Sequence, residues 1–201
     1  MNDKLNCTAL ILAAGLSERM GFYKPLLKFS EEITFLEQLI AEAEKAGVPY
    51  IIVVANKAVN DIILSRPNFK IGKSRIVVNQ QPENGRMSSI KQGLSCLDRE
   101  DYCILINSDN PFVYAHDLET LMEGRKPNCI VQPVVGERNV HPIIIAPEIC
   151  SKIILQEDSN RLDYVLGSYS KHAVVLANKK LMYNINTPQQ YYDAFGRDIS
   201  Y

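Results

Sequence analysis

The chain has 201 residues, 22 of them Lys or Arg and 23 Asp or Glu, and a formal net charge of −1 at pH 7. This length suits one domain with one sizeable core, and the balanced charge offers no basic surface for nucleic acid or for an acidic membrane. The five cysteines include no C-x-x-C pair, so we expect neither a disulfide framework nor a zinc site, and we expect a cytoplasmic protein.

The predicted elements alternate between strand and helix along the chain. Continuous apolar runs predict strands at residues 8–12, 50–55, 75–79, 102–106, 129–135, 142–146 and 173–176. Apolar residues at helical spacing predict helices at 34–46, 57–65, 88–97, 116–123, 148–156 and 161–169, and Thr187 and Pro188 begin a last helix. No segment resembles a secretory signal or reaches the roughly 20 apolar residues that span a bilayer. The pattern predicts an α/β fold: one three-layer α/β/α domain over residues 1–201, with a mostly parallel, Rossmann-like sheet.

The most informative segment is a glycine-bounded loop after the first predicted strand. The apolar run that contains this strand ends at Ala13 and Ala14, and the loop runs from Gly15 to Gly21. Small residues let a ligand approach the backbone closely, and cations offset the charge of a polyphosphate. Arg19 lies in this loop and Lys24 follows it closely. We therefore predict a phosphate-binding loop, with an ordinary strand-to-helix turn as the alternative.

The spacing of this loop excludes two better-known phosphate loops. The dinucleotide fingerprint G-x-G-x-x-G is absent, because Gly15 and Gly21 are the only glycines of the segment. A P-loop has four residues between its glycines and a Lys-Ser or Lys-Thr pair directly after the second. Here five residues intervene, and Phe22 follows Gly21. The loop is therefore a phosphate loop of a third kind, or it is not a phosphate loop.

Other polar residues follow predicted strands at the same edge of the sheet, where α/β proteins bind ligands. Asp109 follows the fourth strand, where a carboxylate can hold Mg²⁺ or occupy a turn. After the third strand, Gly85 allows a turn, and Ser88 or Ser89 can cap a helix or donate to a base or phosphate. Asn186 follows the last strand as a candidate metal ligand or turn residue.

These motifs together resemble one family. Residues 12–24, LAAGLSERMGFYK, are similar to the L-A-(A/G)-G-x-S-x-R-M-G-x-x-K loop of the molybdenum cofactor nucleotidyltransferases. Residues 85–89 resemble the G-x-x-S-S motif of the cytidylyltransferase branch, 109–111 the family's D-x-P, 138–142 its Arg…His-Pro region, and 184–188 its (D/N)-I-(D/N)-T-P. The matches fall in family order over nearly the whole chain. The chain thus resembles the MobA-like NTP transferases of the nucleotide-diphospho-sugar transferase superfamily.

The resemblance implies transfer of CMP from CTP to the terminal phosphate of a molybdenum cofactor pterin, with Mg²⁺ as cofactor and release of pyrophosphate. It implies Arg19, Lys24 and Asp109 as catalytic residues. Asp109 and Asn186 would be the metal ligands, and His141 a weak candidate for acceptor binding. The implied nucleotide-binding set is Leu12, Ala13, Ala14, Gly15, Ser17, Arg19, Gly21, Lys24, Gln80, Gly85, Ser88 and Ser89. A molybdoenzyme or its chaperone would receive the product.

Departures from the family pattern leave alternatives open. Asn184 and Asn186 stand where the cytidylyl branch commonly has aspartates and the guanylyl branch often has asparagines. Residues 107–111 lack the glutamine common in the cytidylyl branch, and residues 157–160 replace an expected Gly-Asp-Gly-Ala-like segment. We prefer CTP over GTP because Ala14 and the Ser88-Ser89 pair both favour CTP in the resemblance. The Ala14 methyl group would crowd a purine, although one methyl discriminates by only ~1–3 kcal/mol. The alternatives are GTP, a sugar or polyol phosphate acceptor, and a non-catalytic cofactor-binding chaperone.

Overall fold

The computed structural model describes residues 6–16 and 20–199, so the predicted site residues Ser17 and Arg19 lie outside the described residues. The strands are β1 (Cys7–Ala13), β2 (Tyr50–Asn56), β3 (Arg75–Asn79), β4 (Tyr102–Asn107), β5 (Cys129–Val135), β6 (Arg138–Asn139), β7 (Ile143–Ile145) and β8 (Ser170–Val175). The α-helices are α1 (Phe35–Lys45), α2 (Lys57–Leu64), α3 (Arg86–Leu94), α4 (Ala115–Glu123), α5 (Pro147–Ile154), α6 (Leu162–Leu166) and α7 (Pro188–Phe195). Three short 3-10 helices are η1 (Lys24–Leu26), η2 (Pro82–Asn84) and η3 (Lys179–Met182).

The described strands form one sheet in the order β3-β2-β1-β4-β7-β5-β6, with β8 paired to β5. Strands β3, β2, β1 and β4 are mutually parallel, and β8 is parallel to β5. Strand β7 runs antiparallel to both β4 and β5, and β6 runs antiparallel to β5. The predicted α/β fold with a mostly parallel sheet is confirmed, and the antiparallel pairs are confined to its second half.

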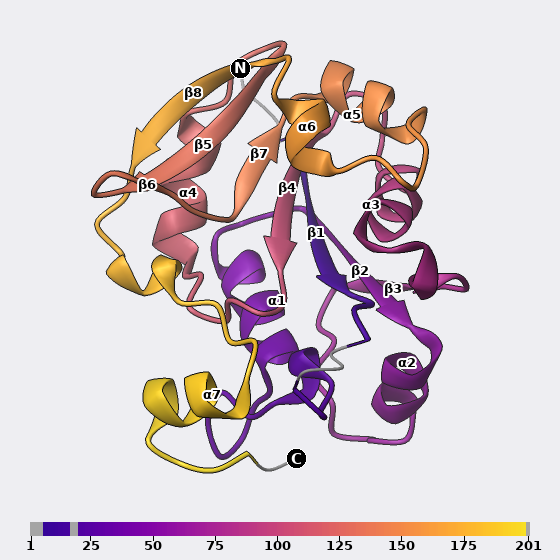
Figure 1. The fold of residues 1–201 in the computed structure, drawn as a ribbon, viewed down its shortest axis with the longest axis vertical. Coiled ribbons are helices and arrows are strands. Elements are labelled where there is room, and N and C mark those ends of the chain that lie inside the picture. The colour runs from indigo at the N-terminus through magenta and orange to yellow at the C-terminus, as the bar shows by residue number, and fades with distance from the viewer. Residues whose placement is uncertain (1–5, 17–19, 200–201) are drawn as a thin grey trace.

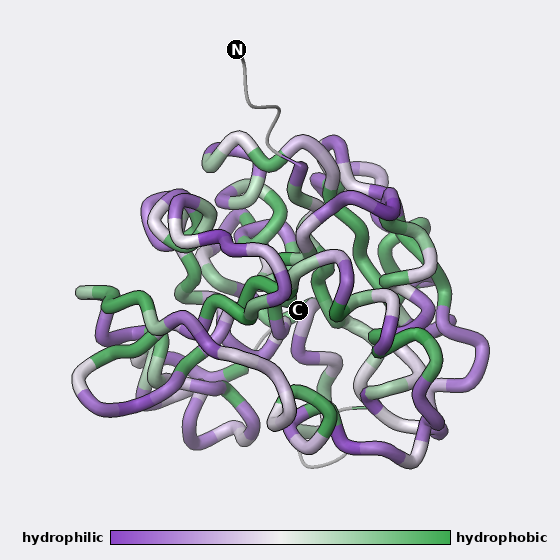
Figure 2. The backbone as a smooth tube through the Cα atoms, turned by 90° about the horizontal axis from the view of Figure 1, so that it is seen from above, coloured by the Kyte–Doolittle hydropathy of each residue, from purple (hydrophilic) through white to green (hydrophobic). Residues whose placement is uncertain are grey.

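Helices cover both faces of the sheet (Figure 1). One apolar cluster joins the sheet to α1, α2 and α4, and a second joins it to α3, α5 and α6. Figure 2 shows the hydrophobic stretches mainly toward the middle of the molecule and the hydrophilic ones mainly along its outline. Within the part of the chain that the structure describes, no helix is long and apolar enough to cross a membrane. The three layers leave the ends of the strands as the places where loops can build a site.

The contact between α3 and β1 depends on a glycine. A Cβ atom at Gly93 would lie 2.2 Å from Leu10 Cδ1 and 2.9 Å from Val54 Cγ2. Leu10 and Val54 are fully buried in the apolar cluster beneath the helix. A glycine at this position therefore lets the helix lie close to the sheet, which also fixes where the N-terminus of α3 meets the end of β1.

Candidate active site

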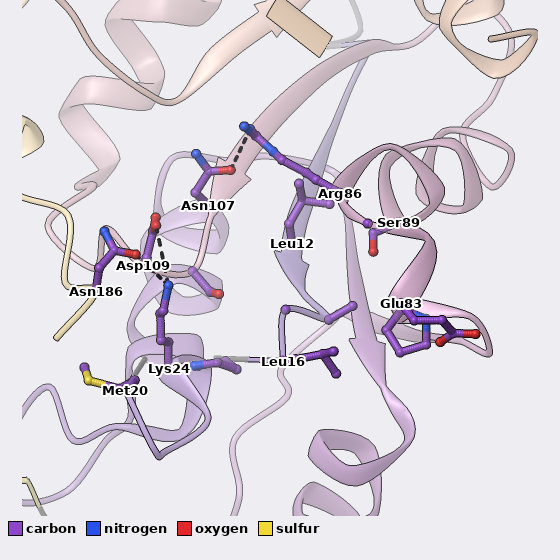
Figure 3. Close-up of a pocket in the computed structure, with 16 residues that line it drawn as sticks. Leu12, Leu16, Met20, Lys24, Glu83, Arg86, Ser89, Asn107, Asp109 and Asn186 are labelled. Carbon is purple, nitrogen blue, oxygen red and sulfur yellow. Dashed lines mark hydrogen bonds and ion pairs between the residues drawn. The ribbon is translucent and has the colours of Figure 1, made fainter. Parts of the chain in front are cut away.

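A cavity of about 600 Å³ opens where β1 and β4 end (Figure 3). Loop residues after β1, β3 and β4 meet there, as expected for a parallel sheet. The wall consists of Leu12, Ala14, Gly15, Leu16, Met20, Lys24, Pro25, Pro82, Glu83, Gly85, Arg86, Ser89, Asn107, Ser108, Asp109 and Asn186. The predicted residues that the structure brings together here are Leu12, Ala14, Gly15, Lys24, Gly85, Ser89, Asp109 and Asn186.

Lys24, Asp109 and Asn186 form the charged end of this cavity, although they are far apart in sequence. Lys24 Nζ donates to Asn186 Oδ1 at 2.6 Å and lies 4.0 Å from Asp109 Oδ2. The exposed fractions of the Lys24 and Asp109 side chains are 19% and 26%. Burial raises the pKa of the Asp109 carboxyl above its ordinary value, and the charges of Lys24 and Arg86 oppose that rise. The three groups are thus held together in a partly desolvated place.

Backbone contacts position this cluster. The Ile185 N–H donates to the Asp109 carbonyl oxygen at 2.7 Å, which places Asn186 beside the end of β4. The buried Asn110 donates through Nδ2 to the Leu181 carbonyl oxygen at 2.7 Å, which fixes the turn after β4 against η3. Thr187 caps α7 by accepting from the Gln190 N–H. The C-terminal segment therefore delivers a site residue to a cavity made otherwise by the first half of the chain.

The residues present fit a divalent cation of the magnesium type. Asp109 Oδ1 is buried and has no hydrogen-bond partner among the described residues. An unpartnered buried carboxylate oxygen is costly unless a cation or water meets it. Mg²⁺ needs only one or two protein oxygens, because waters and substrate phosphates complete its shell. No group of three or more His, Cys, Asp or Glu side chains suited to a metal occurs in the described ranges, so a closed, all-protein metal site is not indicated there.

The N-terminus of α3 contributes one wall of the cavity, and one expectation about it is wrong. Gly85, with φ +88°, is the N-cap, and no side chain caps the helix. The predicted caps, Ser88 and Ser89, lie inside the first turn because the helix begins at Arg86. Asn79, at the end of β3, donates through Nδ2 to Ser88 Oγ at 3.2 Å and to Ser89 Oγ at 3.0 Å. The serines therefore tie α3 to β3, and only Ser89 lines the cavity.

Five predicted nucleotide-binding or acceptor residues lie elsewhere in the described structure. Ala13 is buried in the apolar cluster on the α1 side of the sheet. Gln80 and Ser88 line a smaller hollow of about 260 Å³ beside α3. Gly21 has a φ of +69° and is not part of the cavity wall. His141 lines a second cavity of about 530 Å³. Their proposed contacts with substrate remain predictions.

This second cavity lies between strands β5, β7 and β8, the first turn of α3, and α6 with the segment that precedes it. Its wall consists of Arg86, Met87, Ile130, Gln132, His141, Ile143, Asp158, Ser159, Asn160, Arg161, Leu162, Asp163, Leu166 and Lys171. Burial, with a smaller contribution from Arg86, lowers the pKa of His141 to about 4, so the imidazole is neutral at pH 7. Lys91 fixes one wall by donating to Asp158 Oδ1 at 2.8 Å and to the Gln156 carbonyl at 2.6 Å.

Sequence reasoning missed Arg86 and Asn107. Both line the first cavity, and Arg86 Nη2 donates to Asn107 Oδ1 at 3.0 Å (Figure 3). Asn107 is the last residue of β4, two positions before Asp109. Arg86 could have been found because it directly follows Gly85 in a segment already assigned to the site. It was missed because it occupies a variable position of the G-x-x-S-S motif.

Comparisons with known proteins agree with this geometry. Residues 9–173 match the family described as the MobA-like NTP transferase domain. A probable molybdenum cofactor guanylyltransferase of Bacillus mycoides is 26% identical over 203 residues, covering 96% of this chain and 98% of the relative. The molybdenum cofactor cytidylyltransferase of Escherichia coli is 25% identical over 187 residues, covering 92% and 93%.

Solved structures show the same fold. A nucleotidyl transferase from Methanothermobacter thermautotroptrophicus superposes with a TM-score of 0.79 at 18% identity, covering 95% of this chain and 96% of that one. A Mycobacterium tuberculosis H37Rv protein, determined in complex with manganese, gives a TM-score of 0.74 at 17% identity, with coverage of 96% and 98%. At these identities the likeness is one of fold alone.

Proposed function

The chain belongs to the family of MobA-like NTP transferase domains, and from this premise we propose that it transfers CMP from CTP to the terminal phosphate of a molybdenum cofactor pterin. The enzyme class, nucleotidyltransferase, follows from the family. The observation that carries the finer proposal is the convergence of Lys24, Asp109 and Asn186 at one end of the cavity beside Gly15. That arrangement suits a triphosphate bound with a divalent cation.

The proposed chemistry needs no dedicated general base. The nucleophile is an oxygen of the acceptor phosphate, which is already anionic near neutral pH, and it attacks the α-phosphorus of the nucleotide. Catalysis then depends on positioning and on stabilising negative charge. Lys24 would offset charge on the phosphates, and Arg19 remains a prediction for the same role. Asp109 and Asn186 would hold a bound Mg²⁺, which would supply Lewis-acid stabilisation of negative charge on the phosphates.

Two lines of support favour CTP. Ala14 is 2% exposed and lines the cavity together with Leu12 and Gly15. One methyl group favours a pyrimidine over a purine by only ~1–3 kcal/mol. One curated relative is itself named a cytidylyltransferase.

GTP is the second candidate nucleotide, and it has specific support. Relatives from Bacillus mycoides and Clostridium perfringens are named probable molybdenum cofactor guanylyltransferases. Asn184 and Asn186 also match the asparagines that the resemblance associates with that branch.

For the acceptor, the second cavity offers polar groups and apolar walls, and its volume is suited to a pterin.

The test is a comparison of nucleotides with one acceptor. The protein is incubated with molybdenum-loaded pterin, Mg²⁺ and either CTP or GTP, and released pyrophosphate is measured. We expect CTP to give the higher kcat/KM. A preference for GTP would replace the proposed nucleotide, and absence of turnover with every nucleoside triphosphate would refute the pterin as acceptor. Sugar and polyol phosphates in the same assay test the remaining acceptors.

A further inference from the structure

Arg86 lies where the two cavities meet. It is the one residue of the described chain that lines both the 600 Å³ cavity and the 530 Å³ cavity. The turn at Gly85, with φ +88°, leads directly into Arg86 as the first residue of α3. In Figure 3 its side chain reaches from the helix toward Asn107 at the end of β4. Arg86 therefore belongs to the walls of both the proposed nucleotide site and the proposed acceptor site.

Among the described residues, the Arg86 guanidinium has one hydrogen-bond partner. Arg86 Nη2 donates to Asn107 Oδ1 at 3.0 Å, and within residues 6–16 and 20–199 the structure shows no other hydrogen bond or ion pair of this guanidinium. An arginine carries five N–H donors in a planar fork. Asn107 thus fixes the direction of the fork and leaves most of its donors for a ligand.

The charge of Arg86 acts on both cavities. Burial at the cavity wall lowers the pKa of Arg86, while Asp109 on one side and Asp163 on the other oppose this. By surface area the residue as a whole is exposed, so a ligand has access to it. Arginine remains charged at neutral pH even when its pKa is lowered. The neighbouring His141 is neutral there, because burial lowers its pKa to about 4.

We propose that Arg86 holds the phosphate monoester of the acceptor between the two cavities and presents one phosphate oxygen to the α-phosphorus of the nucleotide. This inference rests on the proposed function. In the transfer, that oxygen bonds to the α-phosphorus, and the bond from the α-phosphorus to the oxygen shared with the β-phosphate breaks. Pyrophosphate leaves with the electron pair of that bond. A bidentate guanidinium offsets the repulsion between the two anions that must approach each other.

Other cations of the second cavity are less suited to this role. Arg161 donates through Nε and Nη2 to the two carboxylate oxygens of Asp163, at 3.0 and 2.7 Å, and its side chain is 81% exposed. Lys171 lies on β8 and lines only the second cavity. Neither reaches the wall of the nucleotide cavity, so neither can hold a phosphate against the α-phosphorus.

The test separates acceptor binding from nucleotide binding. Steady-state kinetics with Mg-CTP and the loaded pterin are measured for wild type, Arg86→Gln, Arg86→Lys and the control Arg99→Gln. Arg99 is an exposed turn residue before β4, at the other end of that strand from the cavity. We expect Arg86→Gln to raise the acceptor KM roughly 10–100-fold, because hydrogen bonds to charged groups are lost. The CTP KM should change less than threefold, Arg86→Lys should recover part of the loss, and Arg99→Gln should match wild type.

A second measurement does not depend on the identity of the acceptor. Phenylglyoxal modifies accessible arginines, and peptide mass spectrometry reports the fraction of Arg86 modified. With Mg-CTP present at saturation, inorganic phosphate should protect Arg86 from modification. If wild type fails to use the pterin, the proposed function fails while this protection still supports the role of Arg86. Protection by Mg-CTP alone, or an Arg86→Gln variant with a raised CTP KM and an unchanged acceptor KM, would overturn the inference.

Discussion

Lys24 offers the sharpest test of the charged end of the cavity. We consider Lys24→Met, which removes the ammonium and keeps an unbranched side chain. Two unit charges 4.0 Å apart, as Lys24 Nζ and Asp109 Oδ2 are, interact by roughly 4 kcal/mol at an effective dielectric constant of about 20. A negatively charged phosphoryl oxygen at a similar distance from Lys24 Nζ would be stabilised by a similar energy. Removing a preorganised transition-state donor typically costs about 10²–10³-fold in kcat, which is roughly 3–4 kcal/mol and agrees with that value.

The same substitution should not weaken metal binding. Without Lys24, Asn186 Oδ1 loses its 2.6 Å donor and Asp109 loses a neighbouring positive charge. Both oxygens then become better ligands for a cation. We therefore expect kcat/KM for the nucleotide to fall about 10²–10³-fold, while the affinity for Mn²⁺ without nucleotide, measured by electron paramagnetic resonance, stays equal or increases.

The matched control is Lys57→Met. Lys57 Nζ pairs with Asp61 at 2.6 Å on the exposed face of α2, with side chains 77% and 52% exposed. Such exposed surface pairs contribute little to stability, so activity and Tm should match wild type. A Lys24→Met enzyme within threefold of wild-type kcat/KM would refute the catalytic role of Lys24. If activity and Mn²⁺ affinity fell equally, the proposal that Lys24 stabilises phosphate charge without contributing to metal binding would be refuted.

Three further predictions test other parts of the molecule. Asn186→Ala should raise the Mg²⁺ concentration for half-maximal activity and Asn186→Asp should lower it; identical metal titrations would remove Asn186 from the metal site. The pKa of His141 is about 4 in the fold against 6.5 ordinarily, so the folded protein should lose up to about 3 kcal/mol of stability as the pH falls from 6.5 to 4. Urea titrations should show a flatter profile for His141→Gln, and parallel profiles would contradict this. Gly93→Ala should destabilise by about 1–3 kcal/mol in urea, because its Cβ would lie 2.2 Å from the buried Leu10, and an unchanged midpoint would show that the helix can shift freely.

Local signals were enough for much of the fold. The predicted strands at 75–79 and 129–135 agree with the bounds of β3 and β5, because continuous apolar runs between turn residues are typical of buried strands. The antiparallel direction of β7 could not be predicted, because three consecutive isoleucines at Ile143–Ile145 would be buried equally well in a parallel or an antiparallel strand. The two-residue strand β6 was missed because both of its residues are exposed and polar. The start of α3 was placed two residues late, because its cap is a glycine at positive φ and not a side chain.

In the candidate site, too, local sequence signals identified some residues, while contacts between distant segments could not be predicted. The loop after β1 and Asp109 could be identified because each begins two residues after a buried strand ends. Asn186 was a candidate, but its contact with Lys24 depends on the Ile185–Asp109 backbone bond between segments far apart in the sequence. Arg86 was not recognised from the sequence, because it occupies a variable position of the motif. Only the packing of α3 on β1 and β2 brings its side chain to both cavities.

The balance of charge explains why these groups belong together. A phosphate monoester carries about −1.5 to −2 near neutral pH, and a nucleoside triphosphate adds more negative charge beside it. On the described part of the chain, the wall of the nucleotide cavity contributes two cationic side chains, Lys24 and Arg86. With both proposed substrates bound, they would leave a large excess of negative charge, which a divalent cation would offset. Asp109 Oδ1 is buried and has no hydrogen-bond partner among the described residues, so it could bind that cation, and this would account for a carboxylate in a cavity proposed to bind anions.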